Sequence, residues 1–315
     1  MSAAHHPTRR TILRTSLAAA VSSVCLRGGA FADATAGEKQ TMLTRPVPAS
    51  GEQIPVIGMG TWSTFDPPSL DEGQLEPLRE VLRIFHAAGG RVIDSSPMYG
   101  KSEDVAGRLT TELGINDDLF FATKAWTDGE QAGIDQMRNS LKRLRRDRIE
   151  LMQVHNFRDL QTHLKTMRKW KDEGTFRYIG VTHYQVQAFD ELERILRREK
   201  LDFVQFNYSI AEPQAEDRML PVARELGVAT LINRTFLGGD LFKKLAGKPL
   251  PEEVKPYAKS WAQAMLKFCL AHEAVTCVIP ATRNPKHMAD NVQAGFGELP
   301  DKAALAALRE IGKQL

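Results

Sequence analysis

The hydrophobic positions of this chain fall into eight short, continuous runs separated by longer segments of helical periodicity. Continuous apolar runs, as opposed to alternating ones, are typical of strands that are covered on both faces. The runs occupy residues 56–59, 91–94, 119–122, 151–154, 178–181, 203–206, 228–232 and 276–279. Eight strand–helix units within about 250 residues predict an α/β fold of the (β/α)8 or TIM-barrel type.

The segments between these runs repeat their apolar residues at the spacing of an α-helix. One of them places four apolar residues on a single face: Leu75, Leu78, Leu82 and Phe85. The opposite face carries charged residues, as expected for helices that surround a barrel. Gly114 and Gly227 stand just before strand runs and predict helix ends, because glycine readily adopts the left-handed conformation that terminates a helix.

Two further short segments precede the first run. Residues 42–47 and 53–57 flank the turn sequence Pro-Ala-Ser-Gly-Glu, which predicts a β-hairpin that closes the bottom of the barrel. A chain of 315 residues is long enough for one such barrel domain. We expect this domain to span residues 41–315, with residues 33–40 as a linker.

The first 32 residues differ in composition from the rest. They contain four arginines and no acidic residue, with Thr-Arg-Arg-Thr-Ile-Leu-Arg at 8–14, a mildly apolar stretch at 16–26 and Ala-Phe-Ala at 30–32. This arrangement resembles a twin-arginine (Tat) signal peptide at 1–32, which implies recognition by the Tat translocon and export of a folded protein to the periplasm or the exterior. The apolar stretch is too short to anchor the protein stably in a membrane. A basic, disordered arm is the alternative.

Charge and cysteine content add two constraints. The formal net charge of +3 comes from the arginines of the leader, since the rest of the chain holds 38 basic against 39 acidic side chains. The nearly equal numbers of basic and acidic side chains after residue 32 argue against a nucleic-acid partner. Beyond the leader only Cys269 and Cys277 remain, so two buried thiols are expected in place of a disulfide. A fold without cross-links suits folding in the cytoplasm before export.

Polar residues end or follow the second, third and fourth runs: Asp94, Tyr99, Lys124 and His155. The carboxyl ends of parallel barrel strands meet on one face, so we expect these side chains to lie together there. A nearby ammonium stabilises a phenolate and lowers the phenol pKa, which makes Tyr99 a candidate proton donor to a carbonyl oxygen. Asp94 can hold Lys124, and His155 can orient the substrate oxygen. A surface tyrosine beside a structural Asp–Lys ion pair is the alternative interpretation.

These motifs resemble those of the aldo/keto reductase superfamily. The likeness runs from Gly-Met-Gly-Thr-Trp at 58–62 to Ile-Pro-Ala-Thr-Arg at 279–283 and includes Gly-Lys-Ser-Glu at 100–103, so it covers nearly the whole barrel domain. It implies that the four polar residues above are the catalytic tetrad. It also implies a nicotinamide cofactor that lies extended across the barrel mouth, without a glycine-rich Rossmann fingerprint.

The resemblance further implies a set of cofactor-binding residues. They are Gly60, Thr61, Trp62, Asp94, Thr182, His183, Gln205, Arg234, Phe236, Leu237, Gly239, Thr282, Arg283, Lys286, His287, Asp290 and Asn291. The family holds the nicotinamide carboxamide with Ser, Asn and Gln, which correspond here to Thr182, His183 and Gln205. Arg283 and Lys286 can pair with a 2′-phosphate, so NADPH is favoured over NADH.

Two positions depart from the family pattern. His183 replaces an amide that is both donor and acceptor, and Arg234 stands where many relatives place an aromatic residue. A guanidinium plane can stack on the nicotinamide ring, and a salt-bridged arginine at the rim is the alternative. The glycines at 238–239 resemble the loop that covers the pyrophosphate, where the absence of a side chain lets backbone N–H groups approach oxygen atoms.

Aromatic residues after the strands are expected to line a substrate pocket: Trp62, Phe65, Trp126 and Phe157. Ordinary packing is the alternative for each. The sequence thus predicts an NADPH-dependent reductase that converts a small-molecule aldehyde or ketone to an alcohol, with Tyr99 as proton donor. A cofactor-binding redox sensor or regulatory subunit on the same barrel, with little turnover, is the alternative function. No metal site is expected, because paired His and carboxylate ligands at metal-binding spacing are missing.

Overall fold

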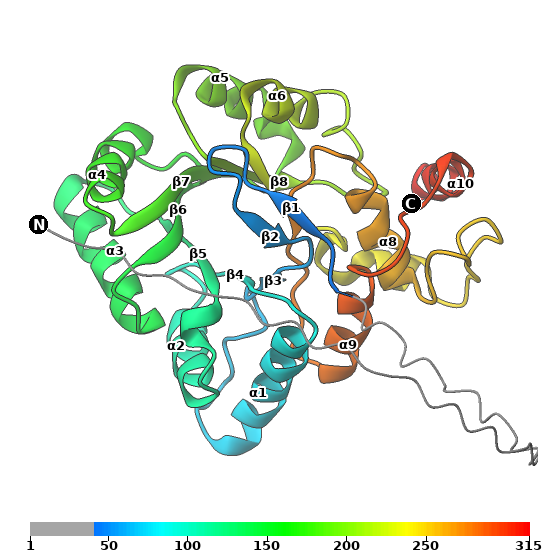
Figure 1. The fold of residues 1–315 in the computed structure, drawn as a ribbon, viewed down its shortest axis with the longest axis horizontal. Helices are drawn as coiled ribbons and strands as arrows, with labels where there is room; N and C mark the ends of the chain where they lie inside the picture. The colour runs from blue at the N-terminus through cyan, green and yellow to red at the C-terminus, as the bar shows by residue number, and fades with distance from the viewer. Residues whose placement is uncertain (1–40) are drawn as a thin grey trace, which may run out of the picture. The chain divides into compact units, whose positions relative to one another are not determined.

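The structure, a computed structural model, describes residues 41–315, so the predicted signal peptide and linker lie outside the described residues. Eight parallel strands form one sheet in which each strand pairs with the next along the chain (Figure 1). They are β3 (Met59–Gly60), β4 (Val92–Asp94), β5 (Phe120–Ala125), β6 (Ile149–His155), β7 (Phe176–Thr182), β8 (Phe203–Asn207), β9 (Ala229–Asn233) and β10 (Cys277–Val278). Bridges from Ile57 to Val278 and from Gly60 to Ala281 bring the last strand back to the first. The nearly closed ring confirms the predicted TIM barrel.

The helices of residues 41–315 lie outside this barrel (Figure 1). They are α1 (Glu72–Ala87), α2 (Ser102–Glu112), α3 (Glu130–Leu144), α4 (Leu160–Asp172), α5 (Phe189–Arg198), α6 (Met219–Leu226), α7 (Asp240–Lys244), α8 (Trp261–Leu270), α9 (Pro285–Gln293) and α10 (Lys302–Gly312). Short 3-10 turns occur at η1 (Asn116–Asp118), η2 (Val186–Ala188) and η3 (Leu237–Gly239). Alternation of strand and helix therefore holds around the ring, as the two periodicities of the sequence predict.

Helix α1 illustrates how the sequence pattern becomes packing. Asp71 precedes the helix and caps it, because its carboxylate accepts a hydrogen bond of 3.1 Å from the backbone N–H of Gln74. The four apolar residues predicted to share a face are all buried in the main core. Gly114 and Gly227 follow α2 and α6 with φ of 66° and 64°, the left-handed conformation that ends a helix at little steric cost for glycine.

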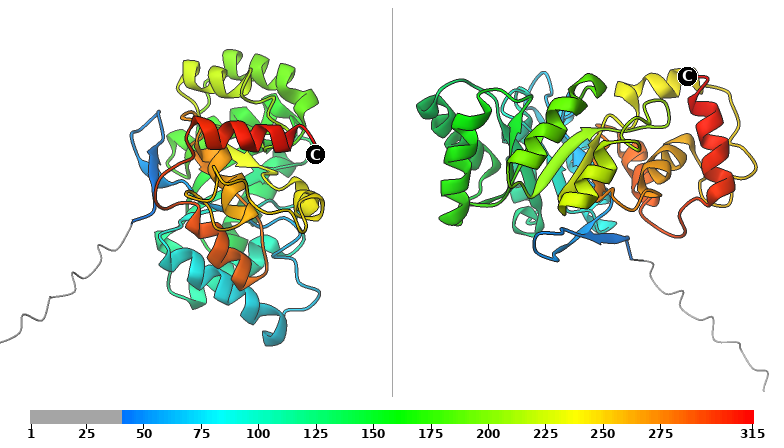
Figure 2. Two further views of the ribbon diagram at one scale, coloured as in Figure 1. Left: turned by 90° about the vertical axis from the view of Figure 1, so that its right-hand side faces the viewer. Right: turned by 90° about the horizontal axis from the view of Figure 1, so that it is seen from above.

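A hairpin closes one end of the barrel. Strands β1 (Thr44–Pro46) and β2 (Gln53–Pro55) pair in antiparallel register, and Figure 2 shows them lying across the barrel end. Val47 and Ile54 are buried in an apolar cluster with residues from the early parts of several barrel strands, among them Phe120. The barrel is therefore shut by apolar side chains at the end where its strands begin. The predicted hairpin is confirmed.

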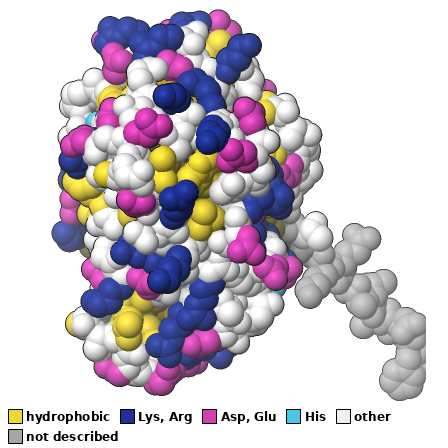
Figure 3. Space-filling view, turned by 90° about the vertical axis from the view of Figure 1, so that its left-hand side faces the viewer, with side chains coloured by type: hydrophobic (Ala, Val, Ile, Leu, Met, Phe, Trp, Pro, Cys, Tyr) yellow, Lys and Arg dark blue, Asp and Glu magenta, His cyan; other side chains and the backbone are white. Residues whose placement is uncertain are grey.

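The outer surface of the barrel mixes charges of both signs. Figure 3 shows the face that carries α3 and α4, where basic and acidic side chains are interspersed. Arg158 and Asp128, in the loops that precede α4 and α3, form an ion pair with Nη2 and Oδ2 2.6 Å apart. No helix within residues 41–315 is long and apolar enough to cross a membrane.

The two cysteines of the barrel domain are free and fully buried. Cys269 lies in α8 and Cys277 in β10. Burial raises the pKa of both thiols well above the usual range, so neither forms a thiolate readily. The expectation of two buried thiols in place of a disulfide is confirmed.

Candidate active site

The tetrad residues come together inside the barrel, at the end where its strands finish. Asp94 and His155 are the last residues of β4 and β6, Lys124 lies in β5 between them, and Tyr99 lies in the loop between β4 and α2. The Nζ of Lys124 donates to Asp94 Oδ2 and to the carbonyl of Ser95, both at 2.6 Å. Lys124 is fully buried, so its ammonium depends on these partners for stability.

Asp94 is held on both sides of its carboxylate. Oδ2 accepts from Lys124, while Oδ1 accepts from the side-chain amides of Gln153 at 3.2 Å and Gln205 at 2.8 Å. Strand register explains the convergence, since Lys124 pairs with Gln153 across β5 and β6. Gln153 was not among the residues predicted from sequence. Its position two residues before His155, on the same face of β6, is the signal that would have identified it.

Tyr99 lies beside Lys124 and His155. The Nζ of Lys124 is 5.1 Å from the centre of the Tyr99 ring, and the Tyr99 and His155 rings meet edge to face with centroids 6.1 Å apart. Burial raises the pKa of Tyr99, and the opposing effect of the Lys124 ammonium is smaller. The expectation of a lowered phenol pKa is therefore wrong for this structure. A neutral phenol, however, is the form that a proton donor requires.

Lys124 and His155 have fixed charge states. Burial lowers the pKa of Lys124, but Asp94 and Tyr99 together outweigh burial and the pKa is raised, so the side chain is an ammonium. Burial, aided by repulsion from Lys124, lowers the pKa of His155 to about 3. His155 is therefore neutral, and Ser96 Oγ lies 3.4 Å from its Nδ1. A neutral imidazole can donate to a substrate oxygen through its protonated nitrogen without adding a second buried cation.

Two of the predicted cofactor residues serve the interior of the protein. The Thr61 hydroxyl donates to the Asp94 carbonyl at 3.1 Å and to Ser95 Oγ at 2.9 Å, and Thr61 is fully buried. A Cβ on Gly60 would lie 2.9 Å from the Ile279 carbonyl, so glycine is required where the barrel closes. Trp62, the next residue, is instead 55% exposed.

The three positions expected to hold a carboxamide differ in availability. Gln205 already donates to Asp94, and its Oε1 accepts from Asn233 Nδ2 at 3.2 Å. His183 is partly buried, and its ring stacks with those of Phe157 and Tyr184, with centroid distances of 4.9 and 5.4 Å. Thr182 is buried at the end of β7. The side-chain amide of Gln205, which the sequence assigned to the cofactor, is thus already hydrogen-bonded within the protein.

The segment after β9 carries the second departure from the family pattern. Arg234 has a φ of 53° and places its guanidinium carbon 6.0 Å from the centre of the Tyr184 ring. Within residues 41–315 it forms no ion pair, which argues against the salt-bridged alternative. Phe236 packs on Phe242 at 4.8 Å, and Leu237 precedes Gly238 and Gly239, where the space a Cβ would fill is open. This segment therefore combines a free cation with an exposed backbone.

The start of α9 presents a second group of cations. Asn284 caps the helix by accepting from the Lys286 N–H at 2.9 Å, and Arg283, Lys286 and His287 are exposed. Asp290 is engaged elsewhere, because it accepts from Ser260 Oγ and Gln263 Nε2 of the α8 start at 2.7 and 2.6 Å. Thr282 and Asn291 are buried. Of the six residues predicted here, the basic ones are those free to meet a ligand.

Three of the four predicted pocket aromatics reach the surface of the barrel mouth. Trp62 is exposed, Trp126 is partly buried beneath the Arg158 guanidinium at 4.6 Å, and Phe157 stacks on His183. Phe65 differs, because it has no exposed surface and packs in the main core. The structure thus gives Phe65 a packing role and leaves the other three at the mouth.

Backbone strain marks the same end of the barrel. Within residues 41–315, six of the seven non-glycine residues with positive φ follow β3, β6 or β9: Ser63, Asn156, Phe157, Asp159, Arg234 and Leu237. Such conformations cost free energy and persist where surrounding structure holds them, often at functional sites. Their location agrees with that of the tetrad.

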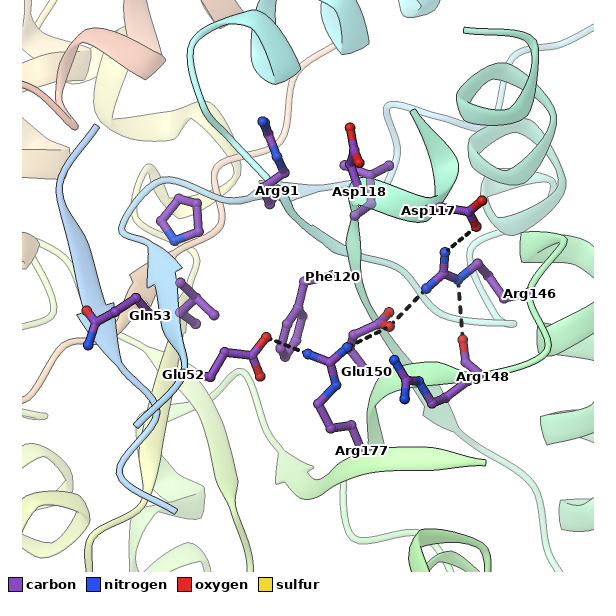
Figure 4. A pocket seen from close by; sticks show the side chains of 13 residues that line it. Glu52, Gln53, Arg91, Asp117, Asp118, Phe120, Arg146, Arg148, Glu150 and Arg177 are labelled. Atoms are coloured by element: carbon purple, nitrogen blue, oxygen red, sulfur yellow. Dashed lines mark hydrogen bonds and ion pairs between the residues drawn. The ribbon is translucent and has the colours of Figure 1, made fainter. Parts of the chain in front are cut away.

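A cavity of about 270 Å³ lies at the opposite end, beside the hairpin (Figure 4). It is lined by four basic and four acidic residues: Arg91, Arg146, Arg148, Arg177, Glu52, Asp117, Asp118 and Glu150. Arg177 pairs with Glu52 of the hairpin and, at 3.5 Å, with Glu150 of β6. Its charges are balanced, no tetrad residue lines it, and its ion pairs tie the hairpin to the barrel. No cluster of three or more His, Cys, Asp or Glu within residues 41–315 is suited to hold a metal ion.

A parallel barrel with a buried Lys–Asp pair, a tyrosine and a histidine at its strand ends defines an oxidoreductase of the aldo/keto reductase type. The aldo/keto reductase family model matches residues 56–312, and the chain belongs to this family. It is similar to aldo-keto reductase YhdN of Bacillus subtilis, with 28% identity over 62% of each chain. Methylglyoxal reductase DkgA of Escherichia coli is 25% identical over 84% of this chain and 93% of its own.

Solved structures share the fold. An aldo/keto reductase from Klebsiella pneumoniae, crystallised in complex with NADP and acetate, superposes with a TM-score of 0.72. It is 24% identical, with 84% of this chain and 93% of that chain covered. The barrel, including the order of its strands, is therefore that of the family.

Proposed function

We propose that this protein reduces an aldehyde or ketone to an alcohol with NADPH, with Tyr99 as the proton donor. The observation that carries the proposal is the arrangement of Tyr99 beside both Lys124 and His155, with Lys124 fixed by Asp94. A surface tyrosine next to an unrelated ion pair would not place a protonated phenol, a buried ammonium and a neutral imidazole together.

The residues of the site divide the work of carbonyl reduction. A reduced nicotinamide, when bound, supplies the hydride that the carbonyl carbon accepts. Tyr99 Oη gives its proton to the oxygen as negative charge develops there, and the Lys124 ammonium stabilises the phenolate that remains. His155, neutral and rigidly placed, donates to the same oxygen and orients the carbonyl. Asp94 holds Lys124 and is itself held by two glutamines, so the network is preorganised.

The residues present fit a nicotinamide dinucleotide phosphate. Arg283 and Lys286 are exposed cations at a helix start and suit an added phosphate, while the open backbone at Gly238 and Gly239 suits a pyrophosphate. Arg234, on the same segment, forms no ion pair within residues 41–315 and places its guanidinium carbon 6.0 Å from the centre of the Tyr184 ring. The NADP named in the Klebsiella pneumoniae complex supports the same choice. We therefore propose NADPH as the cofactor, with NADH bound less tightly.

Turnover with a panel of carbonyl compounds tests the proposal. The purified protein is expected to oxidise NADPH in proportion to the alcohol formed, most rapidly with carbonyls that carry apolar or aromatic groups able to contact Trp62 and Trp126. NADPH binding without turnover on any member of a broad panel would instead favour the sensor or regulatory subunit. Failure to bind NADPH or NADH would contradict both.

Arg283→Ala is expected to weaken NADPH binding by about 10- to 150-fold and NADH binding by less than about twofold. The 2′-phosphate is the charge that distinguishes the two cofactors, and a charge-assisted hydrogen bond contributes about 1.5–3 kcal/mol. Fluorescence titration measures both affinities. Arg148→Ala is the matched control, because Arg148 is likewise exposed but lies at the hairpin end. Equal losses for the two cofactors would show that Arg283 does not contact the phosphate.

We also propose that residues 1–32 direct export by the Tat pathway, with the mature chain beginning near Asp33. Support comes from the paired arginines, the short Ala/Ser-rich apolar stretch and the Ala-Phe-Ala site of the sequence. Replacing Arg9 and Arg10 together by Lys is expected to leave uncleaved, active protein in the cytoplasm, as measured by fractionation. Arg14→Lys, outside the pair, is the control and should be exported. Unchanged cleavage and export of the double variant would contradict a Tat signal.

A further inference from the structure

Unpartnered amide oxygens gather at the ends of the barrel strands. Six buried side-chain N or O atoms within residues 41–315 lack a hydrogen-bond partner, and three of them are the Oδ1 atoms of Asn156, Asn207 and Asn233. Asn207 and Asn233 are the last residues of β8 and β9, and Asn156 follows β6 directly. Buried acceptors are nearly always satisfied in native proteins, so a group of unsatisfied ones indicates a donor that belongs to a ligand or water.

The orientation of the Asn233 amide is fixed by its neighbours. Its Nδ2 donates to the backbone carbonyl of His183 and to Gln205 Oε1, both at 3.2 Å. A carbonyl accepts only, so turning the amide over would set its oxygen against that carbonyl. Gln205 is in turn anchored to Asp94 at 2.8 Å. Asn233 therefore offers a rigid acceptor that is connected to the tetrad through one glutamine.

Asn233 is better placed for a ligand than the other two asparagines. Asn207 is 1% exposed and its nitrogen is tied to Glu212 Oε2 at 2.7 Å, which holds it in the interior. No side-chain hydrogen bond fixes the amide of Asn156 within the described part of the chain. Asn233 is partly exposed as a residue, with its Oδ1 buried, and it directly precedes Arg234 at the barrel mouth.

Two of the positions that were expected to bind a carboxamide, Gln205 and His183, already have partners within the protein. Gln205 is committed to Asp94 and Asn233. His183 Nδ1 already accepts from the Gln185 N–H at 3.2 Å, and its ring stacks with those of Phe157 and Tyr184. The unpartnered Oδ1 of Asn233 is a further acceptor at the end of a neighbouring strand, and no protein donor occupies it.

We propose that Asn233 Oδ1 accepts a hydrogen bond from the carboxamide N–H of the nicotinamide. This inference rests on the proposed NADPH-dependent function. It moves the recognition of the amide from the end of β7, where His183 now stands, to the end of β9. Asn233 is a binding residue in this account, and it fixes which way the carboxamide points.

Cofactor analogues test the proposal on the intact protein. Binding of NADP⁺ is compared by fluorescence titration with that of its 3-acetylpyridine analogue, in which a methyl group replaces the amide nitrogen, and its thionicotinamide analogue, which keeps the nitrogen. Wild-type protein is expected to bind the acetylpyridine analogue about five- to tenfold more weakly than NADP⁺, and the thionicotinamide analogue within about twofold. Equal affinity of the wild type for NADP⁺ and the acetylpyridine analogue would overturn the proposal.

Variants then locate the acceptor. Asn233→Ala is expected to reduce the preference for NADP⁺ over the acetylpyridine analogue to less than about twofold, and Asn207→Ala to retain it. Asn233→Leu, which also removes the acceptor but keeps the side-chain volume, gives the same comparison if the alanine variant unfolds below room temperature. A preference that survives loss of Asn233, or disappears on loss of Asn207, would overturn the assignment. Absence of any NADP⁺ binding by the wild type would instead contradict the proposed function itself.

Discussion

Tyr99→Phe is expected to lower kcat for carbonyl reduction by a factor of about 10² to 10⁴, the usual contribution of a positioned general acid. The phenol gives its proton only as the carbonyl oxygen gains charge, so the loss belongs to the chemical step. The Kd for NADPH should change by less than about twofold, because the substitution removes one oxygen and leaves the ring in place beside His155. Steady-state kinetics and fluorescence titration measure the two quantities.

Tyr184→Phe is the matched control for this result. Tyr184 is also at the barrel mouth, but it is 43% exposed and follows β7, away from Lys124. Its loss of a hydroxyl should leave kcat within about twofold of the wild type. If Tyr99→Phe turns over nearly as fast as the wild type, while Tyr184→Phe is slow, the proton donor has been misassigned.

Lys124→Met is expected to destabilise the folded protein by about 3–5 kcal/mol and to abolish most reduction. The substitution leaves the Asp94 carboxylate buried with two amide donors but no cation, and breaking a buried pair in this way is strongly unfavourable. Urea unfolding measures the loss. The double variant Asp94→Asn with Lys124→Met should recover part of the stability, because no unpaired charge remains, without recovering activity.

Lys313→Met provides the comparison for an exposed ion pair. Lys313 contacts Glu310 at 2.6 Å, with about two thirds of each side chain exposed, and such pairs contribute about 0–1 kcal/mol. A loss at Lys124 no larger than that at Lys313 would contradict the view that Asp94 and Lys124 form a desolvated, mutually dependent pair.

The barrel could be predicted because its signal is local. Strands covered on both faces need continuous apolar runs, and such runs occur at eight places in the chain. The bounds of the first and last barrel strands were predicted least accurately. The runs at 56–59 and 276–279 correspond to only Met59–Gly60 and Cys277–Val278. Where the ring closes, pairing reduces to single bridges, and these depend on tertiary contacts that a hydrophobic pattern does not record.

The sequence predicted which residues form the candidate site, but it did not predict the hydrogen bonds between them. Residues at strand ends of a parallel barrel converge by topology, so the meeting of Asp94, Lys124 and His155 followed from their positions. The commitment of Gln205 to Asp94 did not, because it depends on how interior side chains of β4 and β8, which do not pair with each other, meet inside the barrel. The pKa of Tyr99 was mistaken for a related reason, since burial is a property of the folded chain and here outweighs the adjacent ammonium.

Deuterium transfer tests the central claim most directly. NADPH that carries deuterium on the transferred position of C4 is incubated with the purified protein and a carbonyl compound that it turns over, and the alcohol is analysed by mass spectrometry. Direct hydride transfer followed by protonation from Tyr99 predicts one deuterium on the carbinol carbon and none retained on the hydroxyl after exchange with water. An alcohol without deuterium on that carbon would contradict direct hydride transfer from NADPH at this site.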